Sequence, residues 1–126
     1  MLNQRSLDRL KGVKQALIDI LIEASKDSPY EFQIPADGGL RTAEQQNALF
    51  MKKVSKCDGY NTFSSHQSGN AFDIFLLIDG KASWDKSKLK ATVYHIKEVA
   101  RKKGISLNCG CDWKSFPDFP HCEISK

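Results

Sequence analysis

The sequence has no apolar run that approaches the roughly 18–20 residues needed to span a membrane. Its first ten residues, MLNQRSLDRL, also lack the apolar stretch and the small-residue cleavage site of a secretory signal peptide. We therefore expect a protein that is made in the cytoplasm without stable membrane insertion. It would leave that compartment only if another system released it.

Repeats, linkers and low-complexity segments are missing from the 126 residues as well. A chain of this length fits one domain and can bury a hydrophobic core without disulfides. Hydrophobic residues make up 40% and charged residues 27%, which is ordinary for a folded globular protein. We predict a single domain over residues 1–126 and expect a monomer.

Charge of one sign is only weakly in excess, with 19 Lys and Arg against 15 Asp and Glu. The densest basic group, Arg101-Lys102-Lys103, precedes Gly104 at the expected end of a helix, where cations complement the helix dipole. The sequence has no stripe of aromatic and basic residues that would read bases or phosphates. It therefore does not indicate binding to nucleic acid.

Cysteine is scarce: the chain has Cys57, Cys109, Cys111 and Cys122. Without an export signal, reduced thiols are expected. Cys109 and Cys111 are too close together for the usual C-x2-C spacing of a zinc knuckle. Two alternatives stay open, namely a structural zinc site that adds His121 to the last three cysteines, or cysteines that pack as small buried apolar groups.

Apolar residues at steps of three and four predict helices over residues 6–26 and about 85–103, and an acidic first turn with Glu44 predicts a second helix between them, from 42 to about 54. Thr42 is the expected N-cap of the second helix. Apolar segments predict strands at 30–35, 71–78 and around 121–124, with a short strand after the third helix. Because these elements lack a regular βαβ rhythm, we predict an α+β fold with an antiparallel sheet flanked by helices.

One stretch, residues 64–73 (SSHQSGNAFD), suggests chemistry. His66 and Asp73 stand seven positions apart where a loop meets an apolar strand. A carboxylate in such a strand must face solvent, pair with a cation or bind a metal, because burying it alone is costly. Gly69 and Ala71 are small and let the backbone pack closely between the two side chains.

A second stretch, residues 118–123 (DFPHCE), places Asp118 three positions before His121. The two stretches together supply two imidazoles and two or three carboxylates. A catalytic zinc site needs three nitrogen or oxygen ligands, an open position for water and a nearby carboxylate base. The residues fit such a site, although each one alone also fits an ordinary surface or capping group.

These motifs resemble those of the VanY-like D-alanyl-D-alanine carboxypeptidases and related peptidases. Residues 64–73 match their S-x-H-x-x-G-x-A-x-D signature in full, and 118–121 match the acid that stands three residues before their last metal histidine. Residues 39–45 resemble G-x-R-[ST]-x-x-Q, and 110–113 resemble G-x-D-W. Within that group the chain is most similar to phage endolysins that act as L-alanyl-D-glutamate peptidases.

The resemblance implies a fold like that of the hedgehog and DD-peptidase domains and a zinc peptidase that cuts peptidoglycan stem peptides. In that family's pattern, His66, Asp73 and His121 bind Zn²⁺ and Asp118 is the general base. The similarity to endolysins implies a phage or prophage enzyme that waits in the host cytoplasm until a holin opens the inner membrane.

The same resemblance implies supporting roles for other residues. Arg41 would neutralise charge on the substrate, either an oxyanion or a D-glutamate carboxylate, and Ser64 would bind substrate or orient His66. Gln45 would support the Arg41 segment. Glu123 shares a strand face with His121, so it would either orient that histidine or be a surface carboxylate.

Three function classes remain open at this point. The first is a peptidase, either an L-alanyl-D-glutamate endopeptidase or a D-alanyl-D-alanine carboxypeptidase. The second is a non-catalytic module of the same fold that binds zinc or the wall, for which an intact Asp118 has no use. The third is a structural zinc protein built on the cysteines.

Overall fold

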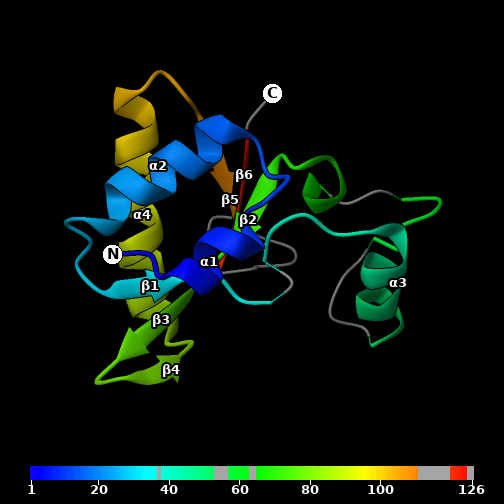
Figure 1. Cartoon of the computed structure of the whole chain (residues 1–126), viewed down its shortest axis with the longest axis horizontal. Helices are drawn as coiled ribbons and strands as arrows, with labels where there is room; N and C mark the ends of the chain where they lie inside the picture. Colours follow the sequence, from blue (N-terminus) through cyan, green and yellow to red (C-terminus); the bar gives the residue numbers. More distant parts are fainter. Residues whose placement is uncertain (37, 53–56, 63–64, 111–119, 125–126) are drawn as a thin grey trace.

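The computed structural model describes residues 1–36, 38–52, 57–62, 65–110 and 120–124. Four helices, one 3-10 turn and six short strands alternate along this part of the chain (Figure 1). In chain order they are α1 (Gln4–Arg9), α2 (Gln15–Ser25), β1 (Glu31–Gln33), α3 (Ala43–Met51), η1 (Ser65–Ser68), β2 (Ala71–Asp73), β3 (Phe75–Ile78), β4 (Lys81–Ser83), α4 (Lys86–Lys102), β5 (Leu107–Cys109) and β6 (His121–Ile124).

The strands form two antiparallel sheets of three strands, in the orders β1-β3-β4 and β2-β6-β5. The α+β prediction is therefore confirmed, with two small sheets in place of a single one. The strand predicted over 71–78 divides at Ile74, because β2 pairs with β6 while β3 pairs with β1. The Ile74 N–H donates to the Pro120 carbonyl at 3.0 Å. The chain thus changes sheet directly after Asp73.

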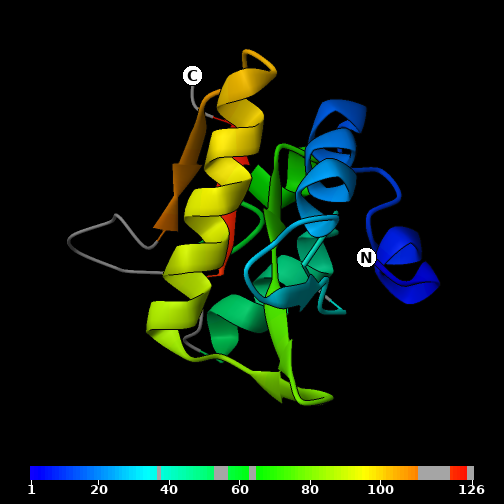
Figure 2. The ribbon, with the colours of Figure 1, turned by 90° about the vertical axis from the view of Figure 1, so that its left-hand side faces the viewer.

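The hydrophobic core lies between the helices α2 and α4 and the two sheets. Figure 2 shows α4 running alongside β5, with β6 next to that strand. The side chains that fill the core and are at most 1% exposed include Leu17, Ile20, Leu21, Phe32, Ile34, Phe72, Ile74, Leu76, Leu89, Val93 and Ile96. In the part of the chain that the structure describes, no helix is long and apolar enough to cross a membrane.

The helix predicted over 6–26 is wrong as a single element, since α1 and α2 are separated by a turn. Gly12 in this turn has φ +90°, a conformation that side chains with a Cβ rarely adopt. The carbonyl of Gly69 accepts a hydrogen bond from the Lys14 N–H at 3.0 Å. A Cβ on Gly69 would lie 2.5 Å from the Gly12 carbonyl oxygen, so the two segments touch backbone to backbone.

The predicted starts of the second and third helices are confirmed. Thr42 caps α3 in a reciprocal capping box with Gln45, and the Asp85 carboxylate accepts from the Lys88 N–H at the start of α4. α3 ends at Met51, before the predicted end near residue 54. It buries only Gln46 and stands at the opposite end of the molecule from α2 and α4 (Figure 1).

Candidate metal centre

Three of the predicted site residues come from three different elements. His66 lies in η1, Asp73 ends β2, and His121 begins β6. The antiparallel register of β2 and β6 places Asp73 directly opposite His121. Side chains on directly opposed residues point to the same face of a sheet, so these two groups meet.

The donor atoms of the three side chains converge on one point. His66 Nε2 lies 3.2 Å from Asp73 Oδ1 and 3.1 Å from His121 Nδ1. His121 Nδ1 lies 3.0 Å from the same Asp73 oxygen. Both imidazoles are buried, with exposures of 1% and 6%. The sequence placed these residues seven and 48 positions apart, and the fold brings them together as predicted.

Hydrogen bonds on the far side of each ring orient the two imidazoles. His66 Nδ1 is 2.9 Å from the Gly39 carbonyl, which can only accept, so Nδ1 carries the proton and Nε2 keeps its lone pair. His121 Nε2 is 2.9 Å from a Glu123 carboxylate oxygen, so its Nδ1 keeps the lone pair in the same way. The remaining nitrogen of each ring faces the Asp73 carboxylate.

This donor set fits a metal ion. Two imidazole nitrogens and one carboxylate oxygen, all within 4.8 Å of one another, could hold a cation between them. With each imidazole donating its N–H outward, three acceptor atoms face one another and only a proton or a cation can satisfy them. Outward hydrogen bonds from ligating histidines to a carbonyl or carboxylate are the usual companions of a metal site.

The second oxygen of Asp73 is held by Arg41. The Arg41 Nη2 group donates to Asp73 Oδ2 at 3.0 Å, and its Nη1 group donates to Gln46 at 3.0 Å. The Arg41 side chain is 9% exposed and that of Asp73 is 15% exposed, so this ion pair is largely buried. Gln46 is fully buried and donates in turn to the Cys57 carbonyl. The guanidinium therefore fixes the orientation of the Asp73 carboxylate.

The environment of Asp73 acts on its pKa in two directions. Burial opposes ionisation and alone would raise the pKa of this carboxyl. When the rings carry a second proton on the nitrogens that face Asp73, their hydrogen bonds and positive charge outweigh burial and hold the pKa of Asp73 well below its usual range. The carboxylate is thus ionised at neutral pH and available as a ligand.

Backbone groups of the segment before α3 complete the site. The Arg41 N–H donates to the His66 carbonyl at 3.0 Å, and the Asp73 N–H donates to the Gly38 carbonyl at 2.8 Å. A Cβ on Gly39 would lie 2.1 Å from the Arg9 carbonyl oxygen. Glycine is required there because the segment passes so close to the end of α1.

Two other predictions fall on described residues. Gln45 accepts from the Thr42 N–H in the capping box, which agrees with a role in supporting the Arg41 segment. Of the two readings of Glu123, the structure favours the one in which this residue orients His121. Ser64, Asp118 and the motif residues 111–113 lie outside the described residues.

The structural zinc site built on cysteines is not supported by the described residues. His121 and Cys122 alternate along β6, so their side chains leave the sheet on opposite faces. Cys122 and Cys109 are buried in the hydrophobic core. Within the described part of the chain, the group that could hold a metal consists of His66, Asp73 and His121.

Sequence reasoning missed Gln46, which contacts Arg41 and is 0% exposed. Residues 43–51 have no clear apolar stripe, so nothing in the sequence signals that Gln46 is the residue this helix buries. The carbonyl partner of His66, at Gly39, left no signal in the sequence, since any residue supplies a carbonyl.

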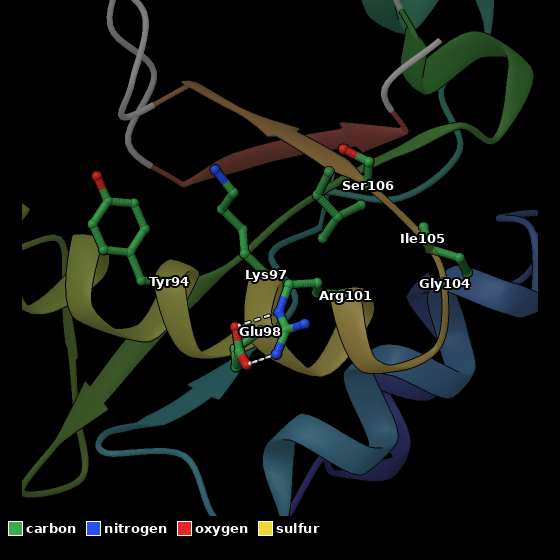
Figure 3. A pocket seen from close by; sticks show the side chains of 8 residues that line it. Tyr94, Lys97, Glu98, Arg101, Gly104, Ile105 and Ser106 are labelled. Carbon is green, nitrogen blue, oxygen red and sulfur yellow. Dashed lines mark hydrogen bonds and ion pairs between the residues drawn. The ribbon is translucent and has the colours of Figure 1, made fainter.

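A separate pocket of about 660 Å³ lies between α4 and β5 (Figure 3). Tyr94, Lys97, Glu98, Arg101 and Ser106 are among the residues that line it. Lys97 lies over the Tyr94 ring at 5.7 Å from its centroid. The lining shares no residue with the His66, Asp73 and His121 group, so this pocket is not part of the candidate metal centre.

Comparisons with known proteins agree with this geometry. The family model described as phage L-alanyl-D-glutamate peptidase matches residues 1–126. The L-alanyl-D-glutamate peptidase of Escherichia phage T5 is 32% identical over 130 residues, covering 98% of this chain and 88% of that protein. The crystal structure of the L-Ala D-Glu endopeptidase ChiX from Serratia marcescens superposes with a TM-score of 0.86 at 25% identity, over 99% of this chain and 90% of the other.

Proposed function

The chain belongs to the phage L-alanyl-D-glutamate peptidase family, and from this premise we propose a zinc-dependent endopeptidase. Its substrate is the stem peptide of bacterial peptidoglycan, and the bond it hydrolyses joins L-alanine to D-glutamate. The observation that supports the zinc dependence is the convergence of two imidazole lone pairs and one carboxylate oxygen within 4.8 Å.

His66, Asp73 and His121 would hold the zinc. Zinc sites with three nitrogen or oxygen ligands from the protein are typical of hydrolytic enzymes. When bound, the ion would supply Lewis-acid chemistry, which lowers the pKa of a water towards ~7 and polarises a carbonyl. Gly39 and Glu123 orient the two imidazoles and Arg41 orients the carboxylate, so the ligands are preorganised before any ion arrives.

Three further residues would act on the substrate. Asp118, as general base, would take a proton from the attacking water and deliver it to the departing amine of D-glutamate. Arg41 would neutralise negative charge on the substrate, either a developing oxyanion or the D-glutamate carboxylate. Ser64 would hydrogen-bond the substrate or orient His66. These roles rest on the matched motifs.

We place the enzyme in the host cytoplasm during its synthesis and at the cell wall during lysis. A peptidase with this substrate must reach the wall to act. The proposed route is release through the inner membrane after a holin opens it. The partner is the stem peptide alone, and a monomer is sufficient because all three proposed ligands come from one chain.

The test is digestion of purified peptidoglycan by the purified protein, followed by identification of the new ends. Cleavage of the L-alanyl-D-glutamate bond frees the amino group of D-glutamate. The signal should disappear with a chelator and return with added zinc. Free D-alanine would indicate a carboxypeptidase in its place, and bound zinc without cleavage would indicate a binding module.

A further inference from the structure

We propose that Cys109 and Cys122 are a site of covalent modification, where the two thiols join in an intramolecular disulfide. The oxidant is a disulfide compound, either a thiol–disulfide oxidoreductase or oxidised glutathione. The cross-link would tie β5 to β6, the strand that carries His121 and Glu123.

The backbone places the two cysteines within reach of each other. Cys109 and Cys122 are directly opposed residues of the antiparallel pair β5–β6. Opposed residues in such pairs have Cα atoms about 4.5–5.5 Å apart, which lies within the range of about 4.4–6.8 Å that a disulfide spans. Their sulfur atoms are 3.0 Å apart, so a movement of about 1 Å brings them to bonding distance.

The surroundings of the pair separate it from the metal centre. Both thiols are buried in the apolar core, with exposures of 1% and 0%. Cys122 leaves β6 on the face opposite to His121 and Glu123. A bond between the two sulfurs would therefore leave the proposed zinc ligands in place. It would cross-link β6 to β5 on the face of the sheet opposite to His121.

The reaction balances as a thiol–disulfide exchange. One cysteine, as thiolate, attacks a sulfur of the oxidant, and a reduced thiol leaves with the electron pair of the broken bond. The second cysteine then attacks the mixed disulfide and expels the other thiol. The protein loses two protons and two electrons, and the oxidant gains them and becomes two thiols. Because β5 is an edge strand, local opening of β5 from β6 is the route by which the oxidant reaches the buried pair.

The setting in which the exchange occurs rests on the proposed function. Cytoplasmic thiols are kept reduced, whereas the space that contains the wall is oxidising. A lytic enzyme released from the first compartment into the second would acquire the cross-link on arrival. The ring closed by the bond spans residues 109–122, which include the proposed base Asp118.

Peptide mapping tests the proposal directly, in a variant that carries Cys57→Ser and Cys111→Ser. The second replacement is needed because trypsin leaves Cys109 and Cys111 on one peptide, residues 104–114, while Cys122 falls on residues 115–126. After incubation with oxidised glutathione, we expect these two peptides to be linked in a monomeric protein. The oxidised form should also unfold at a temperature several degrees higher than the same sample after reduction.

The matched control adds Cys109→Ser to that variant and should show neither the link nor the shift. Two thiols that remain free in the denatured protein after oxidation would overturn the proposal, as would links between chains in place of a link within one chain. Since linkage is read by mass, the result is independent of peptidase activity. A failure of the proposed function would therefore be distinguishable from a failure of the disulfide.

Discussion

The two faces of the β2–β6 pair are built by opposite rules. On one face, the core face, Phe72 and Cys122 are fully buried among apolar side chains. On the other, the site face, their neighbours Asp73 and His121 meet His66 in a cluster of polar groups. Because side chains alternate along a strand, one step along the chain separates a residue that stabilises the fold from one that performs chemistry.

The difference between the faces lies in what burial requires. Apolar side chains gain free energy simply by leaving water, and many residues of similar volume serve equally well. Buried polar groups cost free energy unless each one finds a partner. The site face meets this requirement with the Gly39 carbonyl, Glu123, Arg41 and Gln46, which leaves one shared position for a cation.

The largest expected effect is on the site face. We expect His66→Ala to lose zinc binding and to lower peptidoglycan cleavage by about 10³-fold or more, because a missing ligand removes the metal's chemistry. The fold should remain, since the core face is untouched. His95→Ala is the control, because that histidine bridges α4 to the end of α2 and belongs to no site. Equal losses of activity in both variants would contradict the assignment.

The complementary experiment replaces a buried residue on the core face. We expect Phe72→Ala to lower the free energy of unfolding by about 3–5 kcal/mol, from lost apolar burial and the cavity left behind. The zinc content of the molecules that remain folded should not change. Urea unfolding measures the first quantity and metal analysis the second. Phe50→Ala, at a site 39% exposed, is the matched control and should cost far less.

A smaller effect on zinc affinity is expected when a residue that hydrogen-bonds a proposed ligand is replaced. Glu123→Ala removes the acceptor that orients His121, and loss of such a partner typically costs about 10–100-fold in metal affinity or activity. Glu123→Gln should recover part of this loss because its side-chain oxygen can still accept. Zinc affinity by competition with a chelator is the measurement. Glu23→Ala, a carboxylate 54% exposed on α2, should have no effect on it.

The smallest effect should appear in the pH dependence of stability. A hydrogen bond from the Lys88 N–H lowers the pKa of Asp85, because it favours the ionised cap. A carboxyl whose pKa is lower in the folded state stabilises the fold above its unfolded pKa, about 3.9, and loses this contribution as the pH falls. The melting temperature of wild type should therefore fall more steeply on acidification than that of Asp85→Asn. Parallel curves would contradict this role.

The sequence predicted the members of the site better than their surroundings. His66, Asp73 and His121 could be named because the segments around them resemble the motifs of a known peptidase family; residue types and spacing alone had left a metal site and ordinary surface groups both open. Gln46 and the Gly39 carbonyl could not, because a buried glutamine and a backbone oxygen carry no periodic or compositional signal. These contacts arise only when α3, η1 and β2 are brought together in three dimensions.

The fold shows the same limit. Helix caps at Thr42 and Asp85 follow from local hydrogen bonding, and apolar periodicity correctly identified the core. The breaks at Gly12 and Ile74 depend on distant partners, the backbone at Gly69 in one case and the pairing with β6 in the other. A local pattern continues through such positions because nothing in the neighbouring residues ends it.

The most direct measurement of the central claim is zinc content and cleavage in the same samples of wild type and His66→Ala. We predict a single zinc ion in each wild-type chain, none in the variant, and release of D-glutamate amino groups that follows zinc content through removal and return of the metal. Undiminished cleavage by zinc-free wild type, or equal zinc in the variant, would show that the site face is not a metal centre.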